Sequence, residues 1–206
     1  VGHHVSGNVA LAQARLAIID LATGDQPFFA GAAALVANGE IYNYRELRKD
    51  HALPAATASD CEPPLHLYRR DGAGFAQLLR GMYGIAIHDR AARHVLLARD
   101  PFGIKPLYIA EIPDGIAFAS EPQALIAAGL VTPQLHRPAL HELLQVQFTS
   151  GPETIFQGIS RVLPGETITI ADGRIIARER RAALPVEGPE NISEEAALAR
   201  LDAALI

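Results

Sequence analysis

The stretch Val36-Ala37-Asn38-Gly39-Glu40-Ile41-Tyr42-Asn43 joins a short apolar run to a polar segment, and a helical pattern follows it. An Asn-Gly pair after a strand most often makes a tight hairpin turn. No second strand follows here, so we expect Asn38 and Gly39 at the end of a strand that leads into a loop. In that position a glycine N–H and an asparagine amide can both point at a developing oxyanion, which aids acyl transfer.

Similar apolar runs rich in β-branched residues recur along the chain and are separated by turn signals. They predict strands at residues 16–19, 35–37, 84–87, 95–98, 107–109, 116–119 and 167–170. Helical periodicity predicts helices at residues 45–49, 65–70, 75–79, 121–128 and 137–145. Strands joined mostly by turns, with the helices in separate groups, favour an α+β layered domain.

The composition limits the classes of partner. The 206-residue sequence is 49% hydrophobic, enough for a sizeable core, and its net charge of -5 comes from interspersed acidic and basic residues. This distribution does not indicate a nucleic-acid partner. The apolar run at 32–37 is far shorter than the ~20 residues that cross a bilayer, so no membrane partner is expected. A single cysteine and the lack of zinc-type spacing predict a cytoplasmic protein with no disulfide and no metal site.

A change of composition marks a domain boundary near the end of the sequence. Residues 184–191 contain two prolines and a glycine, which is typical of a linker. After it, Ser193 can cap a helix in which Ala197, Leu198, Leu201 and Leu205 share one face. We therefore predict one domain over residues 1–184, and over residues 185–206 a linker and the first helix of a second, missing domain.

Three segments together resemble a known family. They are the Asn38-Gly39 stretch, Leu11-Ala12-Gln13-Ala14-Arg15-Leu16-Ala17-Ile18-Ile19-Asp20 and Ala58-Ser59-Asp60-Cys61-Glu62. Their combination closely resembles the class II glutamine amidotransferase domain of asparagine synthetases, and further similarity runs through 81–89, 99–108, 119–125 and 162–166. The resemblance implies a four-layer αββα N-terminal-nucleophile hydrolase fold with two stacked antiparallel sheets. It also implies hydrolysis of glutamine, with the ammonia passing to an ATP-dependent domain that amidates aspartate to asparagine.

The resemblance also implies a role for each site residue. Arg15 is expected to bind the α-carboxylate of glutamine, which suits a planar guanidinium, and Asp60 to receive the α-ammonium at the opposite end of the pocket. Asn38 and Gly39 are expected to form the oxyanion hole, with Glu40 beside them. The backbone expected to line the same pocket belongs to Leu16, Ala17, Ile18 and Ile19.

Cys61 is the only thiol in the sequence, yet we do not expect it to be the nucleophile. The enzymes that the chain resembles use a cysteine at the mature N-terminus, whose α-amino group, with a pKa of ~7.7–8.0, acts as the general base. That cysteine is expected ahead of Val1, so this chain should hold glutamine without cleaving it. Cys61 instead lies within Ser59–Glu62, whose Ser-x-x-Glu spacing predicts a capping box, with Pro63 and Pro64 disturbing the helix start.

Two alternatives remain open. The chain could be a non-catalytic scaffold or binding module, as in β-lactam synthetases, or the acceptor could be a cell-surface sugar or a natural-product acid in place of aspartate. The expected partners are glutamine and the chain's own synthetase domain, while the oligomeric state, a homodimer included, is open. No cofactor is expected in this domain, because the Ser-Gly-Gly-x-Asp-Ser motif is missing, and ATP and Mg²⁺ are expected in the synthetase domain. Residues 99–103 and Pro164-Gly165 are predicted to be structural turns.

Overall fold

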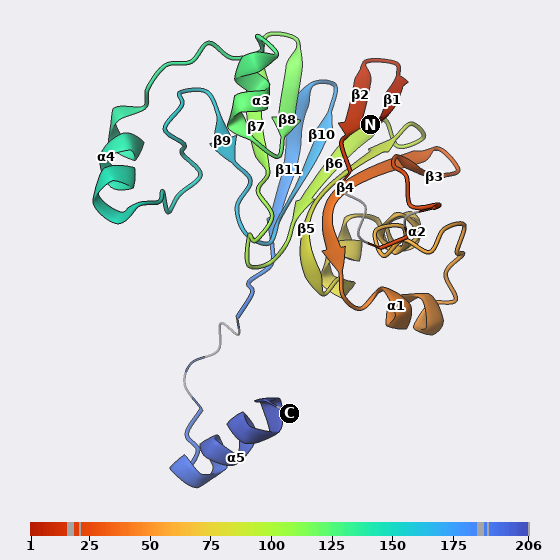
Figure 1. Cartoon of the computed structure of the whole chain (residues 1–206), viewed down its shortest axis with the longest axis vertical. Helices are drawn as coiled ribbons and strands as arrows, with labels where there is room; N and C mark the ends of the chain where they lie inside the picture. Colours follow the sequence, from red (N-terminus) through yellow and green to blue (C-terminus); the bar gives the residue numbers. More distant parts are fainter. Residues whose placement is uncertain (16–18, 21, 185–187, 189, 206) are drawn as a thin grey trace.

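The computed structural model covers residues 1–206 and describes all of them except 16–18, 21, 185–187, 189 and 206 (Figure 1). The elements in chain order are β1 (Gly2–Ser6), β2 (Val9–Gln13), β3 (Phe28–Ala30), β4 (Ala33–Ile41), α1 (Tyr44–Asp50), α2 (Pro63–Asp71), the 3-10 helix η1 (Gly72–Leu78), β5 (Gly81–Asp89), β6 (His94–Arg99), β7 (Tyr108–Ile112), β8 (Gly115–Ala119), α3 (Pro122–Ala127), α4 (Arg137–Val146), β9 (Ser160–Arg161), β10 (Glu166–Ala171), β11 (Arg174–Arg180) and α5 (Glu194–Leu205).

A six-stranded antiparallel sheet forms the centre, in the order β11-β10-β6-β5-β4-β3. Successive side chains of a strand point to opposite faces. Leu35 and Ile85 therefore pack with Leu65 of α2 on one face, whereas Val36 and Leu97 belong to a second core on the other face. The apolar runs of the sequence are continuous because these strands are buried on both sides. Each fully buried side chain of this size contributes about 1.5–3 kcal/mol to stability.

A second β layer covers the other face of the central sheet. It consists of the three-stranded sheet β8-β7-β9 and the separate hairpin β1-β2. Leu11 of β2 and Ile109 of β7 share a core with Val36 of the central sheet. On the outside of this layer, Leu125 of α3 packs against Ala110 of β7, while α1 and α2 lie on the far side of the central sheet (Figure 1). The expected αββα order is confirmed, although the second β layer is divided into two sheets.

Most of the predicted elements are confirmed, but their ends differ: β4 and β5 extend two to four residues beyond the predicted strands at 35–37 and 84–87. The predicted strand at 16–19 falls largely outside the described residues, and the predicted helix at 75–79 is the end of the 3-10 helix η1. The sequence analysis missed β1, β2, β3, β9 and β11, of which β1 and β11 contain mainly half-buried or exposed residues. No helix in the described part of the chain is long and apolar enough to span a membrane.

Two local expectations are wrong. Asn38 and Gly39 lie inside β4, not at its end, because β4 continues its pairing with β5 as far as Ile41. The capping box is not formed, because α2 begins only at Pro63 and the Glu62 carboxylate accepts the N–H groups of Ala56 and Thr57 instead. Proline suits the first helical positions, whose N–H groups have no acceptor within the helix.

Candidate active site

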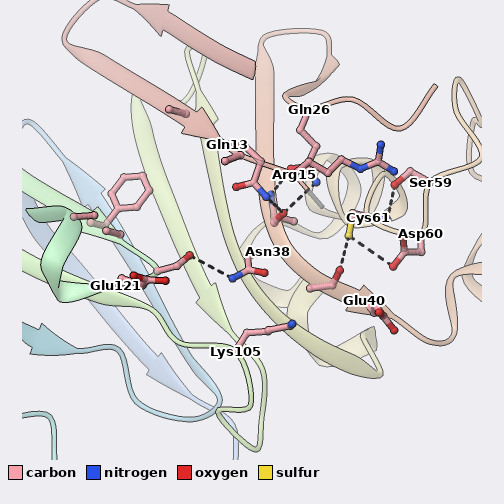
Figure 2. Close-up of a pocket in the computed structure, with 18 of the residues that line it drawn as sticks. Gln13, Arg15, Gln26, Asn38, Glu40, Ser59, Asp60, Cys61, Lys105 and Glu121 are labelled. Carbon is pink, nitrogen blue, oxygen red and sulfur yellow. Dashed lines mark hydrogen bonds between the residues drawn. The ribbon is translucent and has the colours of Figure 1, made fainter. Parts of the chain in front are cut away.

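A cavity of about 590 Å³ opens between β4, the hairpin β1-β2 and the junction of β8 with α3. Its lining comes mainly from residues 12–15, 37–40, 59–61 and 118–121 (Figure 2). The cavity brings together every predicted site residue that the structure describes: Arg15, Ile19, Asn38, Gly39, Glu40 and Asp60. Leu16, Ala17 and Ile18, predicted to line the same pocket with their backbone, lie outside the described residues.

The edge of β4 forms one wall of the cavity. β3 pairs with β4 only as far as Leu35, and side chains meet the backbone groups of β4 beyond that point. Gln26 Oε1 accepts the N–H of Ala37 at 2.6 Å, and Gln13 Nε2 donates to the carbonyl of Ala37 at 2.7 Å. Four residues further along β4, Asp60 Oδ2 accepts the N–H of Ile41 at 2.8 Å. Side chains thus replace the strand that would otherwise continue the sheet.

Gly39 lies midway between these two anchored positions. In an antiparallel ladder, every second residue of a strand directs its N–H and C=O groups away from a given neighbour. The N–H groups of Ala37 and Ile41 both point away from β5, so the N–H of Gly39 points to the same side. That side is the cavity. The glycine N–H is therefore oriented as an oxyanion-hole donor requires.

The side chain of Asn38 provides a second donor beside it. Asn38 pairs with Gly84 of β5, and its amide extends between the two β layers, where Nδ2 lies 3.5 Å from Ser120 Oγ. This contact is at the outer limit of a hydrogen bond, so it leaves the amide able to turn toward a ligand. Figure 2 shows Asn38 pointing into the cavity from β4.

Arg15 lies just beyond the end of β2, and backbone carbonyls hold its guanidinium. Nη2 donates to the carbonyl of Ile19 and, at 2.8 Å, to that of Asp20. Nη1 lies 3.6 Å from the carboxylate of Asp25, whose side chain is 98% exposed, so this ion pair contributes little. These contacts hold the Arg15 guanidinium from one side, and its remaining N–H groups can donate to the carboxylate of a ligand.

Asp60 precedes α2 and is buried. The hydrogen bonds that described residues donate to its carboxylate all reach Oδ2, which leaves Oδ1 as an acceptor for an ammonium group. The expectation that Arg15 and Asp60 occupy opposite ends of the pocket is wrong. Figure 2 shows both on the side of Ser59, with Asn38 across the cavity. The observed placement suits an amino acid better, because its carboxylate and ammonium share one carbon atom.

Cys61 lies at the back of the cavity and is 4% exposed. Its Sγ lies 3.5 Å from the carbonyl oxygen of Gly39 and 3.7 Å from Asp60 Oδ2. Burial, together with the negative charge of Asp60, raises the pKa of the thiol well above its ordinary value. The thiolate, which is the reactive form, is thus disfavoured at neutral pH. The geometry instead makes the Cys61 thiol a hydrogen-bond donor to the carbonyl oxygen of Gly39.

The sequence analysis missed several residues of the cavity: Gln13, Gln26, Lys105, Ser120 and Glu121. Gln13 is the last residue of β2, two residues before Arg15, and the side chains of both line the cavity. Lys105 follows the predicted turn at 99–103, which is confirmed: Gly103 donates to the carbonyl of Asp100 at 3.0 Å, and its φ is +64°. Nothing in the sequence indicated Gln26 as a site residue, because the open edge of β4 that its side chain covers was not predicted.

Residues 1–180 match the family described as glutamine amidotransferase domain. The chain belongs to this family. It is 44% identical over 128 residues to asparagine synthetase (glutamine-hydrolysing) 2 of Bacillus subtilis, a match that covers 61% of this chain and 17% of that protein. It is 37% identical over 180 residues to asparagine synthetase (glutamine-hydrolysing) 1 of the same organism, covering 84% of this chain and 28% of that protein. This amidotransferase domain thus spans between about a sixth and just over a quarter of these relatives.

Solved structures support the same fold. The glutamine phosphoribosylpyrophosphate amidotransferase of B. subtilis, complexed with ADP and GMP, aligns with a TM-score of 0.54 at 24% identity, over 75% of this chain and 31% of that one. A structure described as the allosteric regulatory enzyme of purine biosynthesis aligns with a TM-score of 0.53 at 23% identity, over 79% of this chain and 30% of that one. At this identity the likeness shows the fold alone, and the amidotransferase domain has the expected N-terminal-nucleophile type of α+β fold.

Proposed function

We propose that the cavity binds L-glutamine and that the domain, once a nucleophile is supplied, hydrolyses its side-chain amide. One observation carries the proposal: Arg15 and Asp60 line the same cavity as Asn38 and Gly39, and Figure 2 shows Asn38 across the cavity from Arg15 and Asp60. The first pair is complementary to the α-carboxylate and α-ammonium of a free amino acid. The second pair is complementary to the oxygen of a carboxamide that becomes an oxyanion.

The proposed reaction runs through a thioester. A cysteine thiolate attacks the carboxamide carbon, and its carbonyl oxygen becomes an oxyanion stabilised by the Asn38 amide and the Gly39 N–H. Collapse of this intermediate expels ammonia after proton transfer to the leaving nitrogen. Water then hydrolyses the thioester, which gives glutamate and regenerates the thiol. The balance is glutamine and water to glutamate and ammonia.

The nucleophile in this proposal is not Cys61. Its thiol is buried, has a raised pKa and lacks the free α-amine that the resemblance implies as the base. Because Cys61 is the only cysteine in the sequence, the 206-residue chain is proposed to bind glutamine without turning it over. A cysteine at a mature N-terminus, as the resemblance implies, is proposed to supply the thiol in the whole protein.

The whole protein is proposed to be a glutamine-dependent asparagine synthetase, as the names of the relatives suggest. Ammonia from this domain would amidate aspartate in a domain that uses ATP and Mg²⁺, whereas this domain needs no cofactor for the reaction above. The division into a domain over 1–184 and a linker with a first helix over 185–206 is part of this proposal, and so is a cytoplasmic location. A mere scaffold has no need for the paired donors and opposite charges of the cavity.

Glutaminase activity of the full-length protein tests the proposal. We expect Asn38→Ala to lower kcat about 10²- to 10³-fold, because an oxyanion-hole donor is lost. Asp60→Ala should act mainly on KM, because the α-ammonium is bound alike in the ground and transition states. Unchanged turnover in both variants would refute the assignment. Complete loss of turnover in a folded Cys61→Ser variant would instead make Cys61 the nucleophile.

A further inference from the structure

Lys105 is a cation in the cavity for which the proposed reaction has no role. It is half-buried and makes no ion pair with a described residue. It is one of two lysines in the sequence, and the other, Lys49, is exposed on α1. Figure 2 shows the Lys105 ammonium directed into the cavity between Asn38 and Glu40. Its position therefore calls for a ligand group of negative charge.

The backbone of Lys105 is fixed close to the oxyanion hole. Asp100 Oδ2 accepts the N–H of Lys105 at 2.9 Å and the N–H of Tyr83 at 3.2 Å, and Tyr83 is the Cα partner of Gly39. Arg99 Nε donates to the carbonyl of Lys105 at 2.7 Å. Arg99 and Asp100 are both buried, so a well-packed turn holds this backbone.

Pro106 and Leu107, which follow Lys105, lie on the same face of the central sheet as the Asn38 side chain. A Cβ atom on Gly84, the Cα partner of Asn38, would lie 3.4 Å from the carbonyl oxygen of Pro106 and 3.8 Å from Leu107 Cβ. Residues 106 and 107 therefore pass over β5 at Gly84, on the side of the sheet that carries the Asn38 side chain. Lys105 emerges where the far end of a bound glutamine is proposed to lie.

The charges at the end of the cavity where Lys105 lies indicate a role for its ammonium group. Arg15 and Asp60 are taken up by the α-carboxylate and α-ammonium, which leaves Glu40 and Glu121 as anions and Lys105 as the cation among the described lining residues. Neutral glutamine adds no charge there. Product glutamate adds a γ-carboxylate, which the two glutamate residues repel unless a cation lies beside it.

We propose that Lys105 binds the γ-carboxylate of glutamate and so makes the site hold its product. This inference rests on the proposed function and deepens it, since it assigns product retention to one side chain. The ligand class is an α-amino acid with an anionic side-chain end. Loss of Lys105 then weakens glutamate binding far more than glutamine binding.

Isothermal titration of the 206-residue chain with L-glutamine and with L-glutamate at pH 7.5 tests the proposal. For Lys105→Met we expect about five- to tenfold weaker binding of glutamate, the effect of one half-buried charge pair, and less than twofold weaker binding of glutamine. Lys105→Arg should retain most of the glutamate affinity. Lys49→Met, a matched change on the exposed lysine, should leave both affinities unchanged. Thermal melting of each variant verifies that it is folded.

The outcomes separate the two proposals. If the unmodified chain binds neither amino acid, the proposed function fails, and the role of Lys105 fails with it. If glutamine binds but Lys105→Met weakens both ligands equally, or neither, only the role of Lys105 is overturned. A selective loss of glutamate affinity that Lys105→Arg restores supports it.

Discussion

A methyl group on Gly39 would place its carbon atom 2.1 Å from the carbonyl oxygen of Met82 and 2.6 Å from the Cα atom of Tyr83. Neither neighbour is a flexible side chain, so β4 and β5 would have to separate. At this position of β4, glycine is needed for strand pairing as well as for its N–H. The two requirements coincide because the oxyanion donor lies inside the sheet.

We predict that Gly39→Ala lowers the free energy of unfolding by about 1–3 kcal/mol, the usual cost of overpacking, and also weakens glutamine binding. Gly74→Ala is the matched control, because a Cβ atom there meets no atom within 4 Å. Urea denaturation and glutamine titration of both variants provide the measurement. Equal stability of the two variants would show that β4 and β5 can separate without cost.

At the scale of an element, the loop before α2 depends on one buried carboxylate. Glu62 accepts hydrogen bonds from the N–H of Ala56 at 2.9 Å, from the N–H of Thr57 at 3.0 Å and from Arg48 at 3.1 Å. Burial raises the pKa of Glu62, but the hydrogen bonds from Thr57, Ala56 and His66 outweigh it and hold the pKa below its ordinary value. The loop that these bonds fix carries Asp60 into the cavity.

The sign of the pH effect follows from this lowered pKa. The folded state binds the Glu62 proton more weakly than the unfolded state, whose pKa is about 4.3, so the contribution to stability is complete above that value and is lost as the pH falls through the folded pKa. We predict that Glu62→Gln destabilises the protein by about 1–3 kcal/mol at pH 7 and flattens the decline in stability from pH 5 to pH 3. Exposed Glu195 in α5 serves as the control, and its change to glutamine should leave the curve as it is. A Glu62→Gln curve parallel to that of the unmodified chain would contradict the prediction.

At the scale of the whole molecule, the sequence predicted the central sheet better than the layer that faces it. The strands of the central sheet are buried on both faces, so Leu35 or Ile85 and their neighbours stand out as apolar runs. The hairpin β1-β2 buries only Leu11 fully, and its remaining residues give no comparable pattern. Long-range packing, which a single sequence does not display, decides its place.

The difference between local sequence patterns and long-range packing also explains which residues of the candidate site could be predicted. Arg15, Asn38, Gly39 and Asp60 could be predicted because they lie in the segments that carry the family resemblance. Gln13 and Gln26 could not, because their part is to cover backbone groups of Ala37 at a strand edge. Lys105 was not predicted as a site residue, because it follows directly on residues 99–103, which were interpreted as a structural turn. Residues that act through contacts distant in sequence are the ones that the structure adds.

Three parts of the chain line the cavity, and this leads to a prediction for the whole molecule. Arg15 follows β2, Asp60 precedes α2 and Asn38 lies in the central sheet, so a bound glutamine would link both β layers with the loop before α2. A ligand at 100 times its Kd stabilises the folded state by about 2.7 kcal/mol, and segments that open only locally gain protection where the ligand bridges them. We predict that glutamine slows amide hydrogen exchange in β2 and in residues 59–61 together, while exchange in α4, which does not line the cavity, stays unchanged. Asp60→Asn should abolish the protection in both segments, because the ligand loses one of its two charged anchors. Protection confined to β2 alone would mean that Asp60 does not contact the ligand.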